Sequence, residues 1–254
     1  MIAGAIVAIG GRELGSPGTS PIDKEIIALS GKSCPRALFL PTASNDAERY
    51  IRLFTNIYGK RLGCTTAILR LVTEKPTADE IAERIAEADV IYAGGGNTVK
   101  MLRLWRRLGV DALMHAAHAR GAVLCGVSAG GMCWFQYGVS GSRLFGRKGF
   151  VRARGLGLVQ ATFCPHFDGE IAGGNVGRDK TLSGMIEKHG GIGLGVDNSC
   201  AVAFRDGAWR VIQGKPGVNA YLVARNGERV VRAPLAVRGS FEPLSKLALT
   251  EASH

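Results

Sequence analysis

Short apolar runs alternate with amphipathic segments through the first half of the chain. The runs are rich in Val, Ile and Leu, and they cover residues 2–9, 36–41, 65–71, 89–94 and 122–127. Uninterrupted runs of this kind are typical of parallel strands that are covered on both faces. Strands that alternate with helices form βαβ units. The first half is therefore predicted to fold as an α/β structure, a mostly parallel sheet with helices on both faces.

Helix-terminus signals mark the segments between these runs. Ser20 and Pro21 suit the N-cap and N1 positions of a helix, and Thr77 with Glu80 forms the sequence of a capping box. With the apolar spacing and the closing glycines, these signals predict helices over residues 21–31, 45–59, 81–88, 97–109 and 111–121.

After residue 190 the pattern changes to short alternating segments. Asp206-Gly207 and Asn226-Gly227 each stand between two such segments, which is a strong hairpin signal. We expect an antiparallel C-terminal extension that completes the sheet. The sequence shows neither a clear linker nor an internal repeat, and a single domain over residues 1–254 is predicted.

The composition limits the class of protein. The chain has 254 residues, of which 46% are hydrophobic and 21% charged, so it can fill a sizeable core. No apolar run approaches the roughly 20 residues that cross a bilayer, and the N-terminal stretch lacks the basic region of a signal peptide. The six cysteines form no C-x-x-C pair. We therefore expect a cytoplasmic protein with no membrane partner, no metal and no cofactor.

The net charge of +11 is spread along the chain with two denser spots. One consists of Lys100, Arg103, Arg106 and Arg107, and the other of Arg143, Arg147, Lys148, Arg152 and Arg154. Nucleic-acid binding is not expected because no basic patch with interleaved aromatic residues is evident. The charge predicts a solvated basic surface or, alternatively, a positive field that attracts an acidic substrate.

Residues 126–130 read Gly-Val-Ser-Ala-Gly, between a predicted strand and a predicted helix. The pattern G-x-S-x-G in this context predicts a nucleophile elbow with Ser128 at its tip. The next backbone N–H, that of Ala129, would then face a developing oxyanion. The alternative is a glycine-rich corner with no chemistry.

A second glycine-rich segment, residues 93–98, reads Ala-Gly-Gly-Gly-Asn-Thr at the end of another predicted strand. It matches neither G-x-x-x-x-G-K-[ST] nor G-x-G-x-x-G, so nucleotide binding has little support. Loops at the carboxyl ends of parallel strands meet at one edge of the sheet. This segment is therefore predicted to supply a second oxyanion donor near Ser128.

His166 is the predicted general base among the five histidines. It follows an apolar run and a proline, as a residue held at a strand end would. His115 and His118 lie in an Ala-rich helical segment, His189 precedes a Gly-Gly pair and His254 is the last residue.

The segments AGGGNT, GVSAGG-CWF and GLGL-x5-CPHFD, in this order and spacing, resemble the peptidase E family of serine peptidases, with cyanophycinase as a more distant relative. The resemblance implies a flavodoxin-like fold related to class I glutamine amidotransferases. It implies Ser128 as nucleophile, His166 as base, and the N–H groups of Gly96 and Ala129 as oxyanion donors. It also implies hydrolysis of dipeptides that begin with aspartate.

The third member of the triad departs from that pattern. Residues 129–165 contain no Asp or Glu, and Gly141 stands where the family implies the acid. Asp168 could orient the imidazole, because residues i and i+2 of a strand face the same side. Alternatively Gln136 could hold the ring as a neutral partner, or the acid could come from elsewhere, such as Asp197. The chain could also be a weakened or repurposed homologue.

The predicted function is therefore a serine peptidase that hydrolyses short peptides through an acyl-enzyme on Ser128. Dipeptides with an acidic N-terminal residue are the predicted substrates, and a homodimer is possible. The alternatives are a cyanophycinase-like hydrolase and a non-catalytic binding protein on the same scaffold. An α/β-hydrolase needs the order Ser, acid, His, so it would have to use His189 and would leave residues 93–98 unexplained.

Overall fold

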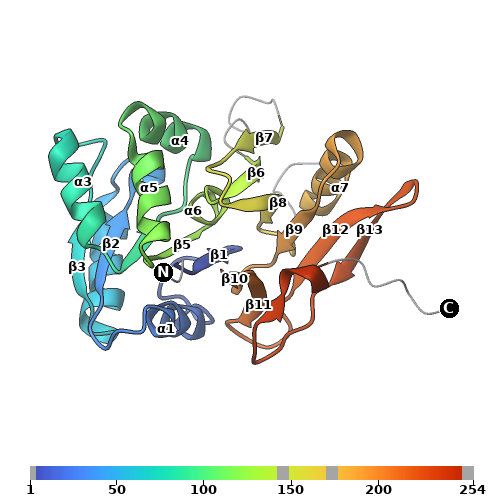
Figure 1. Ribbon diagram of the computed structural model, residues 1–254, viewed down its shortest axis with the longest axis horizontal. Coiled ribbons are helices and arrows are strands. Elements are labelled where there is room, and N and C mark those ends of the chain that lie inside the picture. Colours follow the sequence, from blue (N-terminus) through green and yellow to red (C-terminus); the bar gives the residue numbers. More distant parts are fainter. Residues whose placement is uncertain (1–3, 142–148, 170–176, 248–254) are drawn as a thin grey trace.

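The computed structural model describes residues 4–141, 149–169 and 177–247, which form two β-sheets with helices (Figure 1). The first sheet has eight strands in the order β14-β11-β10-β1-β5-β4-β2-β3, and the second has six in the order β13-β12-β9-β8-β6-β7. The predicted α/β class is confirmed. No helix within the described ranges is long and apolar enough to span a bilayer.

The five apolar runs of the first half form the parallel part of the first sheet. In spatial order the strands are β1 (Ile6–Ile9), β5 (Val123–Val127), β4 (Val90–Ala93), β2 (Arg36–Leu40) and β3 (Thr65–Ile68). Successive side chains of β1 enter two different apolar layers, with Ile6 and Ala8 in one and Val7 and Ile9 in the other. Both faces are therefore buried, as the uninterrupted runs predict.

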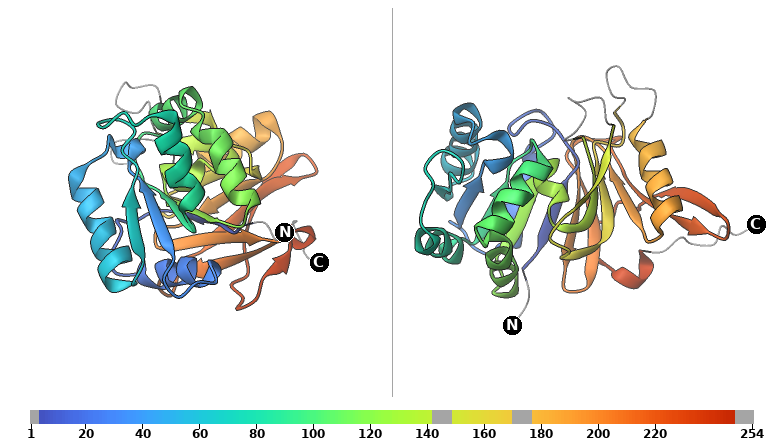
Figure 2. Two further views of the ribbon diagram at one scale, coloured as in Figure 1. Left: turned by 60° about the vertical axis from the view of Figure 1, so that its left-hand side comes forward. Right: turned by 90° about the horizontal axis from the view of Figure 1, so that it is seen from above.

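Helices cover both faces of this sheet (Figure 2). On one face lie α1 (Ser20–Leu29) and α2 (Glu48–Phe54), which continues as a π-helix over Thr55–Arg61. On the other face lie α3 (Ala78–Glu87), α4 (Thr98–Arg107) and α5 (Val110–Ala119). The predicted capping box is present at α3, where the Thr77 side chain accepts from the Glu80 N–H and the Glu80 carboxylate accepts from the Thr77 N–H.

The second sheet begins immediately after the predicted elbow. Its strands are β6 (Phe135–Ser140), β7 (Val151–Arg154), β8 (Val159–Pro165), β9 (Gly193–Val196), β12 (Ala220–Asn226) and β13 (Arg229–Pro234). The neighbours β6, β8 and β9 are parallel. Helix α7 (Arg178–His189) covers the far side of this sheet (Figure 2), where Leu182 and Ile186 pack with Cys164 and Val223.

The two predicted hairpins are present but join different sheets. The strands β10 (Cys200–Arg205) and β11 (Ala208–Gln213) turn at Asp206-Gly207, with φ of 50° and 71°. This hairpin extends the first sheet beside β1, and β11 also pairs with β14 (Glu242–Pro243). The β12–β13 hairpin turns one residue later than expected, at Gly227-Glu228, and extends the second sheet. Alternation reveals a hairpin but not the sheet edge that it joins.

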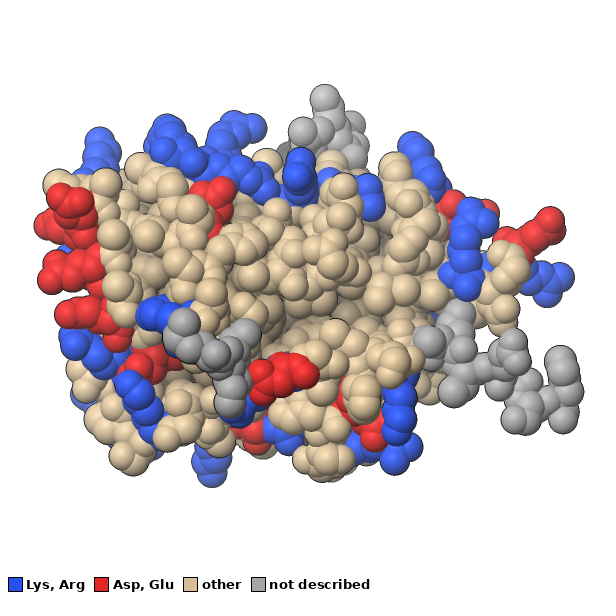
Figure 3. All heavy atoms as spheres, in the orientation of Figure 1, with Lys and Arg blue, Asp and Glu red and all other residues tan. Residues whose placement is uncertain are grey.

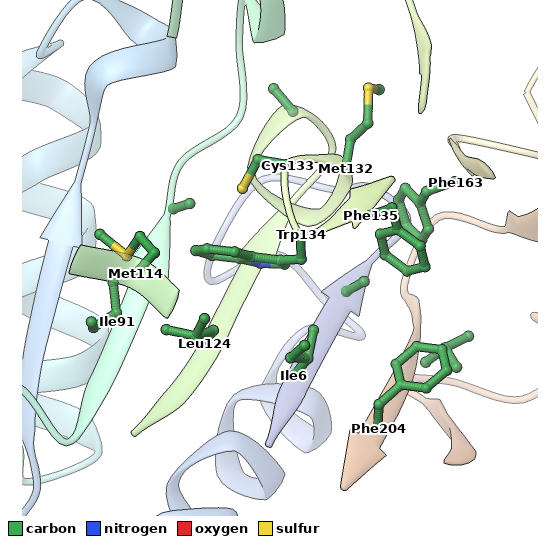
Figure 4. Packing of buried hydrophobic residues seen from close by; sticks show 14 of the residues in the cluster. Ile6, Ile91, Met114, Leu124, Met132, Cys133, Trp134, Phe135, Phe163 and Phe204 are labelled. Carbon is green, nitrogen blue, oxygen red and sulfur yellow. The ribbon is translucent and has the colours of Figure 1, made fainter. Parts of the chain in front are cut away.

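A buried aromatic cluster holds the two sheets together (Figure 4). Helix α6 (Ala129–Met132) has only four residues, so the chain leaves the elbow and enters the cluster at once. Trp134 is fully buried and lies beside Met114 and Leu124 of the first sheet's helical layer and strand β5. Phe135 stacks on Phe163 of β8, with ring centroids 4.7 Å apart. Burial of each such ring stabilises the junction by roughly 2–3 kcal/mol.

A carboxyl group lies on the buried face of α1. Asp23 is 1% exposed, its Oδ1 accepts a hydrogen bond from the Tyr58 hydroxyl at 3.0 Å, and its Oδ2 has no partner in the described chain. Burial raises the pKa of Asp23 to about 7. The carboxyl therefore binds its proton more tightly in the folded state than in the unfolded state. The free energy of unfolding falls as the pH rises from the unfolded pKa, about 3.9, to the folded pKa, about 7.

We expect Asp23→Asn to remove this pH dependence, because the amide keeps an acceptor for Tyr58 and carries no charge. The unfolding free energy of the wild type should fall by about 3 kcal/mol between pH 5 and pH 8, and that of the variant should stay nearly level. Urea unfolding at several pH values measures both. Asp206→Asn, at an exposed turn, is the control and should keep the wild-type slope. Equal slopes for wild type and Asp23→Asn would contradict the expectation.

Candidate active site

Ser128 lies directly after β5 in a strained backbone conformation, with φ of 54° and ψ of −109°. Such a conformation costs a serine on the order of 1–3 kcal/mol. The neighbouring glycines make the turn possible. A Cβ at Gly126 would lie 2.6 Å from the carbonyl oxygen of Ala93, and one at Gly130 would lie 1.9 Å from the same oxygen. The elbow therefore packs backbone against backbone on β4, which explains why the motif needs both glycines.

His166 follows β8 and faces Ser128 from the second sheet. Its Nε2 lies 2.6 Å from the Ser128 Oγ. Its Nδ1 lies 3.0 Å from the Oδ1 of Asn198. The strands β8 and β9 are parallel neighbours with Pro165 opposite Val196, so the residues just beyond their ends meet. Because the amide oxygen can only accept, Nδ1 carries the proton, and Nε2 is free to accept from the serine hydroxyl.

Asp168 contacts Asn198 and not the imidazole. Its Oδ1 accepts from the Asn198 backbone N–H at 3.0 Å and from the Asn198 Nδ2 at 2.8 Å. These bonds fix the amide so that its oxygen faces the imidazole. The structure thus places Asn198, and not Asp168, at the ring. The i, i+2 argument fails because His166 has a φ of 130°, which takes the chain out of strand geometry.

The other two predicted partners of the His166 imidazole, Gln136 and Asp197, lie away from it. Gln136 is exposed on β6 and lines a different cavity, next to Tyr137. The Oδ2 of Asp197 accepts from the backbone N–H of Asn219 at 2.9 Å. Neither side chain contacts the imidazole of His166 in the described structure.

A glycine after β1 completes the site. A Cβ at Gly11 would lie 2.0 Å from the Asn198 Oδ1 and 2.2 Å from the His166 Nδ1. The carbonyl of Gly11 also accepts from the Ser199 N–H at 3.2 Å. The backbone at Gly11 therefore lies directly against the His166–Asn198 hydrogen bond. A side chain at this position would occupy the space of the two bonded atoms, so the position requires glycine.

Of the predicted oxyanion donors, Gly96 lies on the loop after β4, and Ala129 is the first residue of α6. Neither backbone N–H has a hydrogen-bond partner among the residues described. Gly96 has a φ of 141°, and a Cβ there would lie 2.1 Å from the carbonyl oxygen of Ala43. The neighbouring Gly95 N–H is engaged instead, by the Tyr50 hydroxyl at 3.4 Å. Both predicted N–H groups are therefore unpaired within the described chain, which is what an oxyanion donor requires.

Ser128 and His166 line a cleft of about 540 Å³, a volume typical of sites for small ligands. The loop after β1, the start of α2, the loop after β4 and the end of β5 supply its other walls, with Arg12, Glu13, Ala47, Arg49, Tyr50, Gly95 and Val127.

Comparison with known proteins identifies the family. The model of the family described as peptidase family S51 matches residues 6–212. The chain belongs to peptidase family S51. The expected resemblance to peptidase E is confirmed.

Two curated relatives of this S51 peptidase share substantial sequence with it. The "Uncharacterized peptidase YgaJ" of Bacillus subtilis is 34% identical over 236 residues, which cover 92% of this chain and 97% of the relative. The "Uncharacterized peptidase Lin0382" of Listeria innocua is 36% identical over 104 residues, or 40% of this chain and 47% of the relative.

Solved structures share the fold. A peptidase from an acI-B1 Actinobacterium has a TM-score of 0.70 at 20% identity, over 95% of this chain and 97% of that one. A putative peptidase E protein from Listeria monocytogenes EGD-e has a TM-score of 0.59 at 18% identity, over 92% of this chain and 100% of that one.

Burial dominates the electrostatics of His166 in this S51 peptidase. It lowers the pKa of the imidazole, while the hydrogen bond with Asn198 raises that pKa, the Arg178 cation lowers it and the Asp168 charge raises it. The net direction is downward. At neutral pH the imidazole is therefore neutral, with Nε2 able to accept a proton, as a general base requires.

The basic residues of the S51 peptidase are distributed over its surface. Lys and Arg gather along the edge where α4 lies, and Asp and Glu gather near α3 (Figure 3). Arg106 is held by the carbonyl oxygens of Arg154 and Gly155, and Arg152 stacks over the Tyr137 ring. The predicted members Arg143, Arg147 and Lys148 lie outside the described residues. Within the described ranges no group of three or more His, Cys, Asp or Glu could hold a metal.

We expect Gly11→Ala to break the His166–Asn198 hydrogen bond, because its Cβ would occupy the space of both polar atoms. Loss of an oriented base should slow the reaction of Ser128 with a fluorophosphonate by roughly 100-fold. The rate of covalent labelling measures this. Gly184→Ala on α7 is the control, because its Cβ would meet nothing within 4 Å. Undiminished labelling of a folded Gly11→Ala variant would contradict the assignment.

Proposed function

We propose that this chain is a serine peptidase that cleaves short peptides through an acyl-enzyme on Ser128. One observation carries the proposal. A continuous hydrogen-bond chain runs from the Ser128 Oγ through His166 to Asn198 and Asp168, with heavy-atom distances of 2.6, 3.0 and 2.8 Å. A serine on a strained elbow with an oriented base at hydrogen-bond distance has the geometry of an activated nucleophile. This constellation supports a peptidase over a non-catalytic binding protein.

The steps follow from this geometry. The Ser128 Oγ attacks the peptide carbonyl while the His166 Nε2 accepts its proton, and the ring then protonates the leaving amine. Water releases the acyl group when His166 again acts as base. The N–H groups of Gly96 and Ala129 stabilise the oxyanion, and the loss of one such donor typically costs about 2.7–4 kcal/mol in the barrier.

Asn198 and Asp168 are the positioning residues of this scheme. The Asn198 carbonyl holds the Nδ1–H, which fixes the tautomer, as the asparagine does in papain-like Cys-His-Asn sites. A neutral amide stabilises the imidazolium less than a carboxylate does. The Asp168 charge acts from behind the amide and raises the pKa of His166. Together the two side chains replace the single acid of a Ser-His-Asp triad.

The proposed substrates are dipeptides with an acidic N-terminal residue. Arg178, at the start of α7, supports this choice. Burial lowers the pKa of its guanidinium, and no carboxylate among the described residues forms an ion pair with it. Its guanidinium donates a 3.5 Å hydrogen bond to the carbonyl of Val139 and lies over the face of the Phe150 ring, and its backbone carbonyl accepts from the Cys164 thiol at 3.7 Å. A partly buried cation with no carboxylate partner among the described residues, within electrostatic reach of His166, favours an anionic group near the site.

We expect Ser128→Ala to abolish hydrolysis of Asp-Leu, with a loss of roughly 10⁴–10⁶-fold in kcat. Ser30→Ala, at the end of α1, is the control and should keep the wild-type rate. Initial rates on Asp-Leu, Glu-Leu, Ala-Leu and Leu-Leu measure both points. Full turnover by Ser128→Ala would refute the nucleophile, and a wild type that favours Leu-Leu would refute the acidic preference alone.

Two variants separate the roles of Asn198 and Asp168. Asn198→Ala removes the ring's hydrogen-bond partner and should lower the plateau value of kcat/KM by roughly 100-fold, and it should also move the rising limb to lower pH because that hydrogen bond raises the pKa of His166. Asp168→Asn keeps an acceptor for Asn198 but removes the charge that raises the pKa of His166. The rising limb of its pH profile should therefore move to lower pH, since the base must be unprotonated. Profiles of kcat/KM from pH 5 to 9 test this, and an unmoved limb in Asp168→Asn would contradict it.

A further inference from the structure

Three charged side chains line the cleft that contains Ser128. They are Arg12, Glu13 and Arg49, here called the charged rim. Arg12 and Glu13 belong to the loop after β1, and Arg49 belongs to the first turn of α2. Arg49 forms an ion pair with Glu13 and thereby joins the two walls of the cleft. All three side chains are exposed, so a ligand in the cleft can reach them.

Glu13 is ionised, and Arg12 has no ion-pair partner among the residues described. The hydrogen bond from Arg49 lowers the pKa of the Glu13 carboxyl, which therefore carries its charge at neutral pH. The Arg12 guanidinium makes no ion pair with any residue that the structure describes. The rim thus offers one carboxylate and two guanidiniums, one of them without a counter-charge.

The backbone fixes Arg12 beside the catalytic pair. Its φ is 96°, a conformation that a residue with a Cβ rarely adopts. Such strain persists where the surroundings determine the conformation, and it is frequent at ligand-binding positions. The neighbour of Arg12 in the chain is Gly11, whose backbone packs against His166 and Asn198. Arg12 directly follows Gly11 in the chain, so its guanidinium is attached to the cleft wall beside the His166–Asn198 hydrogen bond.

A dipeptide has charges that match this rim. Its α-ammonium and its C-terminal carboxylate flank a single peptide bond, whereas an internal segment of a long chain presents neither charge there. Carboxylates bind ammonium groups through charge-assisted hydrogen bonds, and guanidiniums bind carboxylates in a bidentate manner. An exposed ion pair such as Arg49–Glu13 contributes little to stability, so a substrate ammonium can share Glu13 at small cost.

We propose that the charged rim selects peptides by their two charged ends. Glu13 binds the α-ammonium of the residue before the scissile bond, Arg12 binds the C-terminal carboxylate of the residue after it, and Arg49 holds the Glu13 carboxylate in place. This assignment rests on the proposed peptidase function and restricts it to dipeptides. It concerns the peptide ends, and it is separate from the acidic side chain for which Arg178 is suited.

Three substrates test the assignment, namely Asp-Leu, N-acetyl-Asp-Leu and Asp-Leu amide. Glu13→Gln should lower kcat/KM by about 10-fold or more on the two peptides with a free ammonium and leave the acetylated peptide unaffected. Arg12→Gln should lower it to a similar extent on the two peptides with a free carboxylate and leave the amide unaffected. Glu48→Gln is the control, because Glu48 neighbours Arg49 but pairs with Arg70, and all three rates should remain at the wild-type value.

The outcomes distinguish this inference from the function on which it rests. Equal losses on all three peptides, or no loss on any, would overturn the recognition of the ends. If Ser128 is labelled by a fluorophosphonate and the blocked peptides are cleaved as fast as Asp-Leu, the end recognition fails and the serine mechanism stands. If the wild type cleaves none of the three and Ser128 resists labelling, the proposed function itself fails. Thermal melts of the variants should match the wild type, since all three side chains are exposed.

Discussion

The hydrogen bond between the Ser128 Oγ and the His166 Nε2 joins the two sheets of the molecule. Ser128 follows β5 of the first sheet and His166 follows β8 of the second, so the 2.6 Å between their side chains depends on how the sheets pack. The buried rings of Trp134 and Phe135 hold that junction, only a few residues beyond the elbow. The same short segment therefore supplies both the serine and the packing that keeps its base in place, and the site depends on the rigidity of the core.

Close backbone contacts give the site its shape. The elbow lies on the carbonyl of Ala93, and the turn at Gly11 lies on the His166–Asn198 bond. Positive φ values at Ser128 and His166 store strain that rigid neighbouring strands maintain. A substitution at Gly11, Gly126 or Gly130 should lower activity without removing any reacting group, because the added Cβ would displace polar atoms of the site.

The electrostatics of the site differ from those of an acid-containing triad. Asn198 gives the imidazole a fixed orientation with no charge, and Asp168 contributes charge from the position behind it. Burial outweighs that charge and lowers the pKa of His166. The base is therefore ready at neutral pH, while the imidazolium that forms during the reaction receives weaker support than a directly bonded carboxylate would give.

The sequence by itself determined the features that local patterns encode. Apolar runs and caps predicted the parallel strands and their helices, and the glycine spacing predicted the elbow at Ser128 and the loop at Gly96. A histidine after an apolar run and a proline predicted His166 at a strand end. Only the tertiary structure decided that Asn198 reaches the ring in place of Asp168, that Gly11 covers this bond, and that the two hairpins extend different sheets. Each of these contacts joins segments far apart in the chain, and the order of strands that brings them together leaves no local signature in the sequence.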